Sequence, residues 1–381
     1  MPRLIATFLT CSLLTACAGN IPQIPVHGEL SGQPIHTTVD SEAAKYFLEH
    51  YLKGERSRPE LDATIASIER DIGDELPTRS SLKSIAERQS TDFAALVLWQ
   101  SLLRRPENRQ AQDMFFEEFS RLKAHVQGTP DRLPVNMSQY LIVFVPGWFY
   151  KSQPENGADF SQPRQALSAA SARTILLDIE ENGAVEHNGD LIANQLIRLS
   201  RGENNIILVS GSKGGPEAAL ALTTLHQMGV PNSVKAWVNI GGTLRGSALA
   251  DKALRWPLRW YVKLFVIGGG SFDGIESLTT TRSAERATRT SLPSDVFVLN
   301  YVGIPLSGQV SKRARFGYSL LREEGPNDGL TQIVDEIPSG SVTIAELGLD
   351  HFFADPAISL KTVALARTVI RHLEDRPPTP P

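Results

Sequence analysis

The sequence predicts an α/β fold in which a doubly wound, mostly parallel sheet follows an N-terminal all-α unit. Two observations carry this prediction. From residue 139 onward, six short apolar runs are separated by segments whose apolar residues recur at helical spacing, and strands that alternate with helices form parallel sheets. Before residue 139 the helical spacing dominates, which indicates a separate helical unit.

The composition is that of an ordinary globular protein. The chain has 381 residues, of which 41% are hydrophobic and 21% charged, and its 38 basic and 42 acidic side chains give a net charge of −4. A nucleic-acid-binding surface needs an excess of basic residues, so no nucleic-acid partner is expected. The two cysteines, Cys11 and Cys17, both lie near the N-terminus, which excludes a disulfide framework or a cysteine-ligated zinc site in the folded body.

Residues 1–16 have the pattern of a bacterial lipoprotein signal peptide. A short basic start precedes an apolar stretch, and Leu14-Thr-Ala-Cys17 resembles the lipobox after which the cysteine is acylated. We therefore expect Cys17 to carry lipid and to anchor the chain in the bacterial cell envelope. Because Ala18 rather than Asp follows, the outer membrane is expected in a Gram-negative cell. The alternative is an ordinary signal peptide that happens to contain a cysteine. Residues 17–38 contain Gly, Pro and Gln and are predicted to form an extended tether.

Residues 39–133 are predicted to form the N-terminal helical unit. Ser57–Glu60 has the spacing of a capping box, apolar residues at helical spacing follow it, and Gly73 marks the end of that helix. Further helices are predicted near 91–105 and 107–125. The unit contains no cluster of catalytic side chains, so we expect a packing and spacer module. Specific binding of a partner is the alternative.

Residues 134–375 are predicted to form the domain that contains the parallel sheet. Short continuous apolar runs are typical of strands buried on both faces. These runs cover 140–145, 174–179, 205–209, 234–240, 295–302 and, more weakly, 341–344. Helical spacing separates them, most clearly over 188–201, 215–228 and 357–373. The proline-rich residues 376–381 are expected to form a solvated tail.

The third predicted strand runs into Ser210-Gly-Ser-Lys-Gly-Gly215, after which a helix starts at once. A nucleophile elbow requires a strand, a tight turn and a helix, with small residues around a central serine. The turn exposes the Ser212 hydroxyl and points the N-terminus of the helix at it, where a developing oxyanion is stabilised. A glycine-rich turn at this place can instead bind phosphate, but neither of the phosphate-binding glycine motifs is present.

A serine hydrolase built on such a sheet needs an acid and a histidine, in that order, after the serine. His351 lies in a predicted loop directly after the weak sixth strand, whereas His372 lies within the terminal helix. Asp328 lies in the predicted turn 325–329, between the fifth strand and the histidine loop. The alternatives are a plain Asn-Asp-Gly turn and a turn histidine capped by Asp350. The reserve acids are Asp335, Asp295 and Asp273.

Region 139–373 resembles the lipase and esterase branch of the α/β-hydrolase superfamily. The resemblance rests on the Ser212 elbow and on four further segments: Val145–Trp148, Gly242–Ser247, Asn327–Gly329 and Asp350–His351. Three positions depart from the family pattern. The segment at Gly242 is one residue shorter and lacks a proline and a histidine, and Ser210 stands where glycine is usual. Phe353 stands where some relatives have a calcium-binding aspartate, so no metal is expected.

The resemblance implies a role for each of the reactive residues. Ser212 is the nucleophile, His351 the general base and Asp328 the acid that orients the imidazole. The backbone N–H groups of Trp148 and Lys213 are the expected oxyanion donors, while the Lys213 side chain is expected to be a solvated surface group. No cofactor is expected.

An aromatic insertion at about residues 246–275 separates the fourth and fifth predicted strands. Trp256, Trp260 and Phe265 lie within it, and Gly268-Gly-Gly270 ends its apolar stretch. In lipases, amphipathic helices with glycine hinges form lids over acyl pockets at this place. The resemblance therefore implies a lid whose aromatic residues border the substrate. A plain buried helix is the alternative.

Together these expectations describe a lipid-anchored serine hydrolase that cleaves carboxylic esters. Its partners are an ester with an acyl or lipid group, as substrate, and the membrane that holds the anchor. The same triad also serves amidases, peptidases and acyltransferases, which stay open. A catalytically silent scaffold lipoprotein is the alternative from another class. The sequence indicates no particular protein partner.

Overall fold

The computed structural model describes residues 21–30, 33–126, 137–230, 233–255, 259, 262 and 271–375. Cys17 and the rest of the predicted signal peptide lie outside the described residues, as does the tail 376–381. The three aromatic residues of the predicted lid, Trp256, Trp260 and Phe265, lie outside them as well. The expectations for these residues stay predictions.

Six parallel strands form one sheet in the described part of the chain, in the order β4-β3-β5-β6-β7-β8. All six lie where the sequence predicts strands: β3 (Leu141–Val145), β4 (Arg173–Leu176), β5 (Ile206–Gly211), β6 (Val234–Ile240), β7 (Phe297–Ile304) and β8 (Val342–Leu347). β3 and β5 are buried along their whole length, as continuous apolar runs predict for strands covered on both faces.

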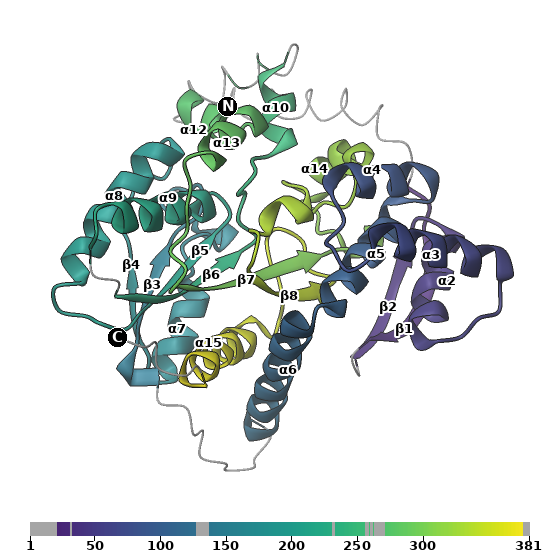
Figure 1. Cartoon of the computed structure of the whole chain (residues 1–381), viewed down its shortest axis with the longest axis horizontal. Coiled ribbons are helices and arrows are strands. Elements are labelled where there is room, and N and C mark those ends of the chain that lie inside the picture. The colour runs from purple at the N-terminus through teal and green to yellow at the C-terminus, as the bar shows by residue number, and fades with distance from the viewer. Residues whose placement is uncertain are drawn as a thin grey trace, which may run out of the picture.

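Helices cover both faces of this sheet, which confirms the predicted doubly wound α/β class (Figure 1). On one face lie α6 (Pro106–Val126), α7 (Ser161–Ala169) and α15 (Ile358–Glu374). On the other face lie α8 (Val185–Leu199) and α9 (Gly214–Gln227). Because the strands are parallel, their carboxyl ends all point to one edge of the sheet, where the reactive groups of such folds gather.

Shorter helices connect the later strands near that edge. They are α10 (Ala248–Leu254), α12 (Phe272–Ser277) and α13 (Thr280–Ala287) between β6 and β7, and α14 (Arg315–Leu321) between β7 and β8.

The N-terminal unit contains the predicted helices, with one corrected boundary. Its helices before α6 are α2 (Glu42–Glu49), α3 (Pro59–Ile72), α4 (Arg79–Arg88) and α5 (Thr91–Arg104). The predicted capping box at Ser57 is wrong, because Arg58 is the N-cap of α3 and makes no side-chain cap hydrogen bond. Pro59 explains the difference. A proline at the first helical position holds the residue before it in an extended conformation, and Arg58 adopts that conformation.

The segment predicted as a tether contains a β-hairpin, so the prediction of an extended tether is wrong over most of residues 24–38. β1 (Ile24–Leu30) pairs antiparallel with β2 (Gln33–Val39). Val26 and Val39 are fully buried on the hairpin face that packs against α2. Alternation of buried and exposed residues is the strand signal, but in this sequence Pro25 and Gly28 interrupt it.

The N-terminal helices share a hydrophobic core with the sheet and do not form a detached spacer. Phe47 of α2 and Phe93 of α5 belong to the same buried cluster as Val302 and Ile304 of β7 and Ala345 of β8. Each of these five side chains is almost completely buried. The unit therefore covers the β7–β8 side of the sheet, as Figure 1 shows.

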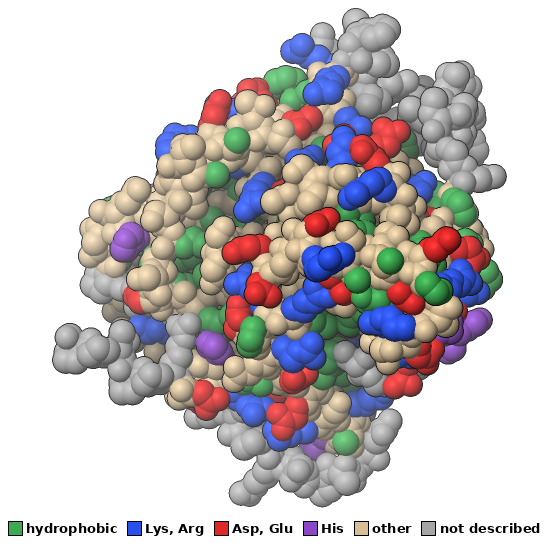
Figure 2. Space-filling view, turned by 45° about the vertical axis from the view of Figure 1, so that its right-hand side comes forward, with side chains coloured by type: hydrophobic (Ala, Val, Ile, Leu, Met, Phe, Trp, Pro, Cys, Tyr) green, Lys and Arg blue, Asp and Glu red, His purple; other side chains and the backbone are tan. Residues whose placement is uncertain are grey.

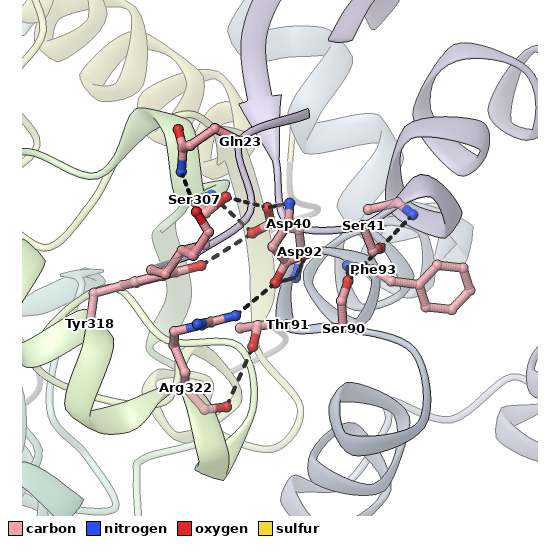
Figure 3. Close-up of polar contacts among 12 residues, drawn as sticks. Gln23, Asp40, Ser41, Ser90, Thr91, Asp92, Phe93, Ser307, Tyr318 and Arg322 are labelled. Atoms are coloured by element: carbon pink, nitrogen blue, oxygen red, sulfur yellow. Dashed lines mark hydrogen bonds and ion pairs between the residues drawn. The ribbon is translucent and has the colours of Figure 1, made fainter. Parts of the chain in front are cut away.

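A pair of buried carboxyl groups lies at this junction (Figure 3). The Asp40 backbone N–H donates to Asp92 Oδ2 over 2.8 Å. Asp92 also accepts hydrogen bonds from the backbone N–H and the hydroxyl of Ser307 and from the Tyr318 hydroxyl. Arg322 forms an ion pair with Asp40 at 3.3 Å. Burial, followed by the negative charge of Asp40, raises the pKa of Asp92 to about 7.

Charged side chains of both signs are interspersed on the face seen in Figure 2. This distribution agrees with the near-neutral composition of the chain. Within the described residues, no helix combines the length and apolar character that a membrane span requires.

Candidate active site

Ser212 lies in the tight turn between β5 and α9, with the left-handed φ of 52° that a strained elbow requires. Such a conformation costs a residue other than glycine on the order of 1–3 kcal/mol. The glycines after it allow the close packing of the turn. A Cβ on Gly214 would lie 2.8 Å from the carbonyl oxygen of Pro146, and one on Gly215 would lie 2.7 Å from Asn239 Oδ1.

Ser210, which stands where the elbow pattern usually has glycine, has a hydrogen-bond partner inside the fold. The indole N–H of Trp237 donates to its hydroxyl over 2.8 Å, and both side chains are completely buried. The buried hydroxyl is therefore satisfied, and the departure from the family pattern leaves the elbow intact.

The structure brings Ser212, His351 and Asp328 together. His351 Nε2 lies 2.8 Å from Ser212 Oγ, and His351 Nδ1 lies 2.5 Å from Asp328 Oδ2. The three residues come from the loops after β5 and β8 and from the turn after α14. This is the geometry of a nucleophile, a base and the acid that orients the base.

Backbone groups hold Asp328 in a fixed orientation. Its Oδ1 accepts hydrogen bonds from the backbone N–H groups of Leu330 and Thr331, at 2.9 and 2.8 Å. Its carbonyl oxygen accepts from the His351 backbone N–H at 2.9 Å. With Oδ1 occupied, Oδ2 faces the imidazole. The Asp328 carboxylate is thus held toward His351, which a plain Asn-Asp-Gly turn would not require.

The charge balance around His351 favours its protonated form. Burial lowers the pKa of the imidazole, but the negative charge and hydrogen bond of Asp328, with Asp350 nearby, outweigh it and raise the pKa above its ordinary value. An imidazole whose protonated form is stabilised accepts a proton from the serine hydroxyl more readily.

Glu336 is a residue of the site that the sequence reasoning missed. Its carboxyl group is completely buried and lies within hydrogen-bonding reach of the Asp328 carboxyl. Neither of its oxygens accepts a hydrogen bond from the described residues. Burial and the charge of Asp328 raise the pKa of Glu336 well above its ordinary range. The raised pKa favours the protonated form of Glu336, which can donate a hydrogen bond to Asp328.

The three reserve acids lie elsewhere. Asp335 is buried against the N-terminal unit, where it forms an ion pair with Arg79 at 3.2 Å. Asp273 is exposed in the first turn of α12, and Asp295 is exposed before the start of β7. Asp328 is thus the one of the four named acids that contacts His351.

Trp148 lies on the loop after β3, beside the nucleophile. A Cβ on the preceding Gly147 would lie 3.5 Å from Ser212 Cβ, which places this loop against the elbow. The Trp148 indole N–H donates to Asn182 Oδ1 over 2.5 Å, and the Trp148 ring stacks on Phe149. These contacts fix the loop whose backbone is the expected oxyanion donor.

The Lys213 side chain is buried, so the expectation of a solvated surface group is wrong. It is 2% exposed and forms an ion pair with Glu217, one helical turn along α9. Asn188 of α8 donates a hydrogen bond to the same carboxylate over 2.8 Å. A buried charge requires such a partner. The pair fixes the start of α9, where Lys213 is the N-cap residue.

A cavity of about 1050 Å³ opens at the triad. Ser212 and His351 line it together with Trp148, and its remaining walls are mainly apolar. Cavities of this size and character bind organic ligands. Within the described residues, no group of His, Cys, Asp and Glu side chains is arranged to hold a metal ion.

No protein-family model matches the chain, and no curated protein matches it. Among solved structures, the metagenomic carboxyl esterase MGS0156 is similar with a TM-score of 0.50 at 20% identity, over 65% of this chain and 79% of that one. The mature lipase BlEst2 of Bacillus licheniformis has a TM-score of 0.49 at 23% identity, over 62% and 92%. The monoacylglycerol lipase of Paleococcus ferrophilus has a TM-score of 0.34 at 17% identity, over 61% and 93%. At such identities the likeness shows the α/β-hydrolase fold alone, in agreement with the sheet order.

Proposed function

We propose that this chain is a serine hydrolase that cleaves carboxylic esters through an acyl-enzyme. One observation carries the proposal: Ser212, His351 and Asp328 are joined by hydrogen bonds of 2.8 and 2.5 Å at the wall of a large apolar cavity. The solved structures of similar fold include a carboxyl esterase and lipases, which agrees with this activity.

The reaction follows from the positions of the three side chains. Ser212 Oγ attacks the ester carbonyl while His351 Nε2 takes the hydroxyl proton, and Asp328 stabilises the imidazolium that forms. When the tetrahedral intermediate collapses, the C–O bond to the alcohol breaks and His351 returns the proton to the leaving oxygen. Water then attacks the acyl-enzyme by the same proton transfers and releases the carboxylic acid.

The backbone N–H groups of Lys213 and Trp148 are the proposed donors to the oxyanion. Lys213 precedes the first residue of α9, so its N–H lies at the positive end of the helix dipole. Loss of one such donor typically removes about 3–4 kcal/mol of transition-state stabilisation. The buried pair of Lys213 and Glu217 supports this role, because it fixes the turn that contains the donor.

A fluorophosphonate probe tests the proposal directly. The probe phosphonylates a serine only when a histidine activates the hydroxyl, so we expect labelling at Ser212, detected by peptide mass spectrometry. Ser212→Ala is the matched control and should take no label. A folded wild-type protein that stays unlabelled would refute the triad and favour the scaffold alternative. Labelling with hydrolysis of amides but not of esters would favour the amidase or peptidase alternative.

We also propose that Cys17 is acylated and that the lipid anchors the enzyme in the bacterial cell envelope. The lipobox pattern Leu14-Thr-Ala-Cys17 supports this. Stable anchoring requires more than one acyl chain, since a single chain binds membranes only marginally. An anchored esterase would meet its substrates at a lipid surface.

A further inference from the structure

The chain that follows Cys17 is docked on the domain within a few residues. The side chain of Ile21 packs against a buried cluster formed by Val310, Ala314 and Tyr318. Gln23 is also held in place, because its side-chain oxygen accepts a hydrogen bond from the Thr38 hydroxyl of β2 over 2.6 Å. Four residues span at most about 14 Å, which keeps Cys17 within that distance of Ile21. A free tether over residues 17–38 would instead allow about 75 Å.

Helix α14 lies between this docking point and the cavity at the triad. Its residues Phe316 and Leu320 line the cavity, whereas Ala314 and Tyr318 belong to the cluster on which Ile21 packs. Residues two apart on a helix point about 200° apart, so the two contacts use opposite sides of α14. Since a helix is about 10 Å across, the proposed anchor is attached within about 25 Å of the α14 wall of the cavity.

Exposed cations and an exposed aromatic ring border the cavity on this side. Lys312, Arg313 and Phe316 all line the cavity and are exposed, and Phe316 is 50% exposed. Arg315 is exposed next to them. We call these four residues the rim surface. Residues 311–322 contain four basic and no acidic side chains. The three cations of the rim surface form no ion pair with any residue that the structure describes, so their charges are available to a partner.

The chemistry of the rim surface suits an anionic lipid bilayer. The whole chain has a net charge of −4, so a negatively charged surface attracts only a local excess of cations on it. Each Lys or Arg close to an anionic bilayer strengthens binding about fivefold. A half-exposed ring among such cations can enter the boundary between the headgroups and the acyl chains. An acidic protein surface offers the same charge, but the short connection to Cys17 favours the bilayer.

Resting on the proposed acylation of Cys17, we propose that the rim surface docks on the anionic lipid surface of the membrane that holds the anchor. The anchor and the rim surface then act together, because the short connection keeps the bilayer at a high effective concentration beside the rim. The cavity opens toward that bilayer. An ester embedded in the membrane therefore reaches Ser212 without crossing bulk water.

Vesicle binding by a chain without lipid tests the rim surface by itself. The chain consists of residues 17–381 with Cys17→Ser and thus contains every residue that the structure describes. Ser212→Ala is added so that no lipid is hydrolysed. Binding is measured by co-sedimentation with two kinds of vesicle. One is phosphatidylcholine alone, and the other is phosphatidylcholine with one third phosphatidylglycerol.

Two double variants of this chain locate the binding surface. Lys312→Gln/Arg315→Gln removes two cations of the rim surface. Arg198→Gln/Arg201→Gln is the matched control, because it removes two exposed cations at the end of α8, just before β5 begins at the opposite edge of the sheet. Neither Arg198 nor Arg201 forms an ion pair with a described residue. Both variants change the net charge by the same amount.

We expect the chain to bind the vesicles that contain phosphatidylglycerol and to bind phosphatidylcholine alone far more weakly. Lys312→Gln/Arg315→Gln should weaken binding to the anionic vesicles about 25-fold, at about fivefold for each cation, and the control should change it by less than about twofold. Equal losses in the two double variants, equal binding to the two kinds of vesicle, or no binding at all would overturn the rim surface as the docking site.

Hydrogen exchange of the acylated wild type tests the orientation on the membrane. Exchange over residues 311–320 should be slower on anionic vesicles than in the chain without lipid, and exchange over residues 194–201 should be the same in both. Equal exchange over residues 311–320 would overturn the orientation. Mass spectrometry of Cys17 and fluorophosphonate labelling of Ser212 are read separately. An unmodified Cys17 refutes the anchor and an unlabelled Ser212 refutes the proposed hydrolase, and neither result alters vesicle binding by the chain without lipid.

Discussion

Replacement of Asp92 by Asn should change how stability depends on pH. The folded chain binds the Asp92 proton more tightly than the unfolded chain does, because the pKa rises from its ordinary 3.8 to about 7. The contribution of this group to the free energy of unfolding is therefore fully present below pH 3.8 and is lost as the pH rises toward 7. The difference between the two pKa values, at 1.36 kcal/mol per pH unit, amounts to about 4 kcal/mol.

The side chain at position 92 of Asp92→Asn is neutral at every pH, so the variant does not lose this contribution to the free energy of unfolding as the pH rises. The lost hydrogen bonds with Ser307 and Asp40 cost the variant stability, but that cost does not depend on the charge of residue 92. The free energy of unfolding of the variant, minus that of the wild type, should therefore rise by up to about 4 kcal/mol between pH 4 and pH 8.

Urea unfolding at several pH values between these limits measures this difference. Asp178→Asn is the control, because Asp178 is exposed, pairs with Lys151 and has a pKa lowered by that hydrogen bond. The free energy of unfolding of Asp178→Asn, minus that of the wild type, should not rise with pH. A difference between Asp92→Asn and wild type that stays constant from pH 4 to pH 8 would refute the raised pKa of Asp92.

The remaining predictions concern the site and the anchor. Ser212→Ala should remove nearly all ester hydrolysis. Asp328→Asn should lower kcat by about 10⁴-fold, because it favours the wrong imidazole tautomer. Full activity in Asp328→Asn would show that the acid is misassigned. Glu336→Leu removes the proposed hydrogen bond to Asp328. This loss should raise the pKa of His351 and move the acid limb of the pH profile of kcat/KM to higher pH. Glu336→Gln keeps a neutral donor, so its acid limb should match that of the wild type. If both variants have the same acid limb, that result would contradict a positioning role of Glu336. Cys17→Ser should abolish acylation, and an unmodified mature N-terminus in the wild type, seen by mass spectrometry, would refute the anchor.

The reactive residues could be found from the sequence because their signals are local. Ser212 has small neighbours between a strand and a helix, and Asp328 and His351 each lie in a short turn in the required chain order. Such constraints act within a few residues. The six strands could be predicted for the same reason, since each contains a short, largely apolar run.

The features that were missed depend on distant contacts. Glu336 stands beside Asp335 in the sequence, and only the packed structure separates a carboxyl that meets Asp328 from one that pairs with Arg79. The buried Lys213 was also missed, although Glu217 stands four residues later, a spacing that permits an ion pair on a helix. Because lysine is rarely buried, the residue type favoured a surface position over the ion pair that this spacing permits.

The core shared by the N-terminal unit and the sheet has a consequence for the order of folding. Ser307, which donates to Asp92, follows it by 215 residues in the chain, and Val302 of the shared core lies just before Ser307. Contacts between such distant residues form late and slowly, since a long loop must close before they contribute stability. During synthesis, the apolar surface of α2 and α5 that meets β7 and β8 therefore stays uncovered until these strands emerge. A chain that starts at residue 134 would in turn leave the side of β7 and β8 that they cover open to aggregation. The first part of the chain to be made thus completes its packing only after β7 and β8 have been made.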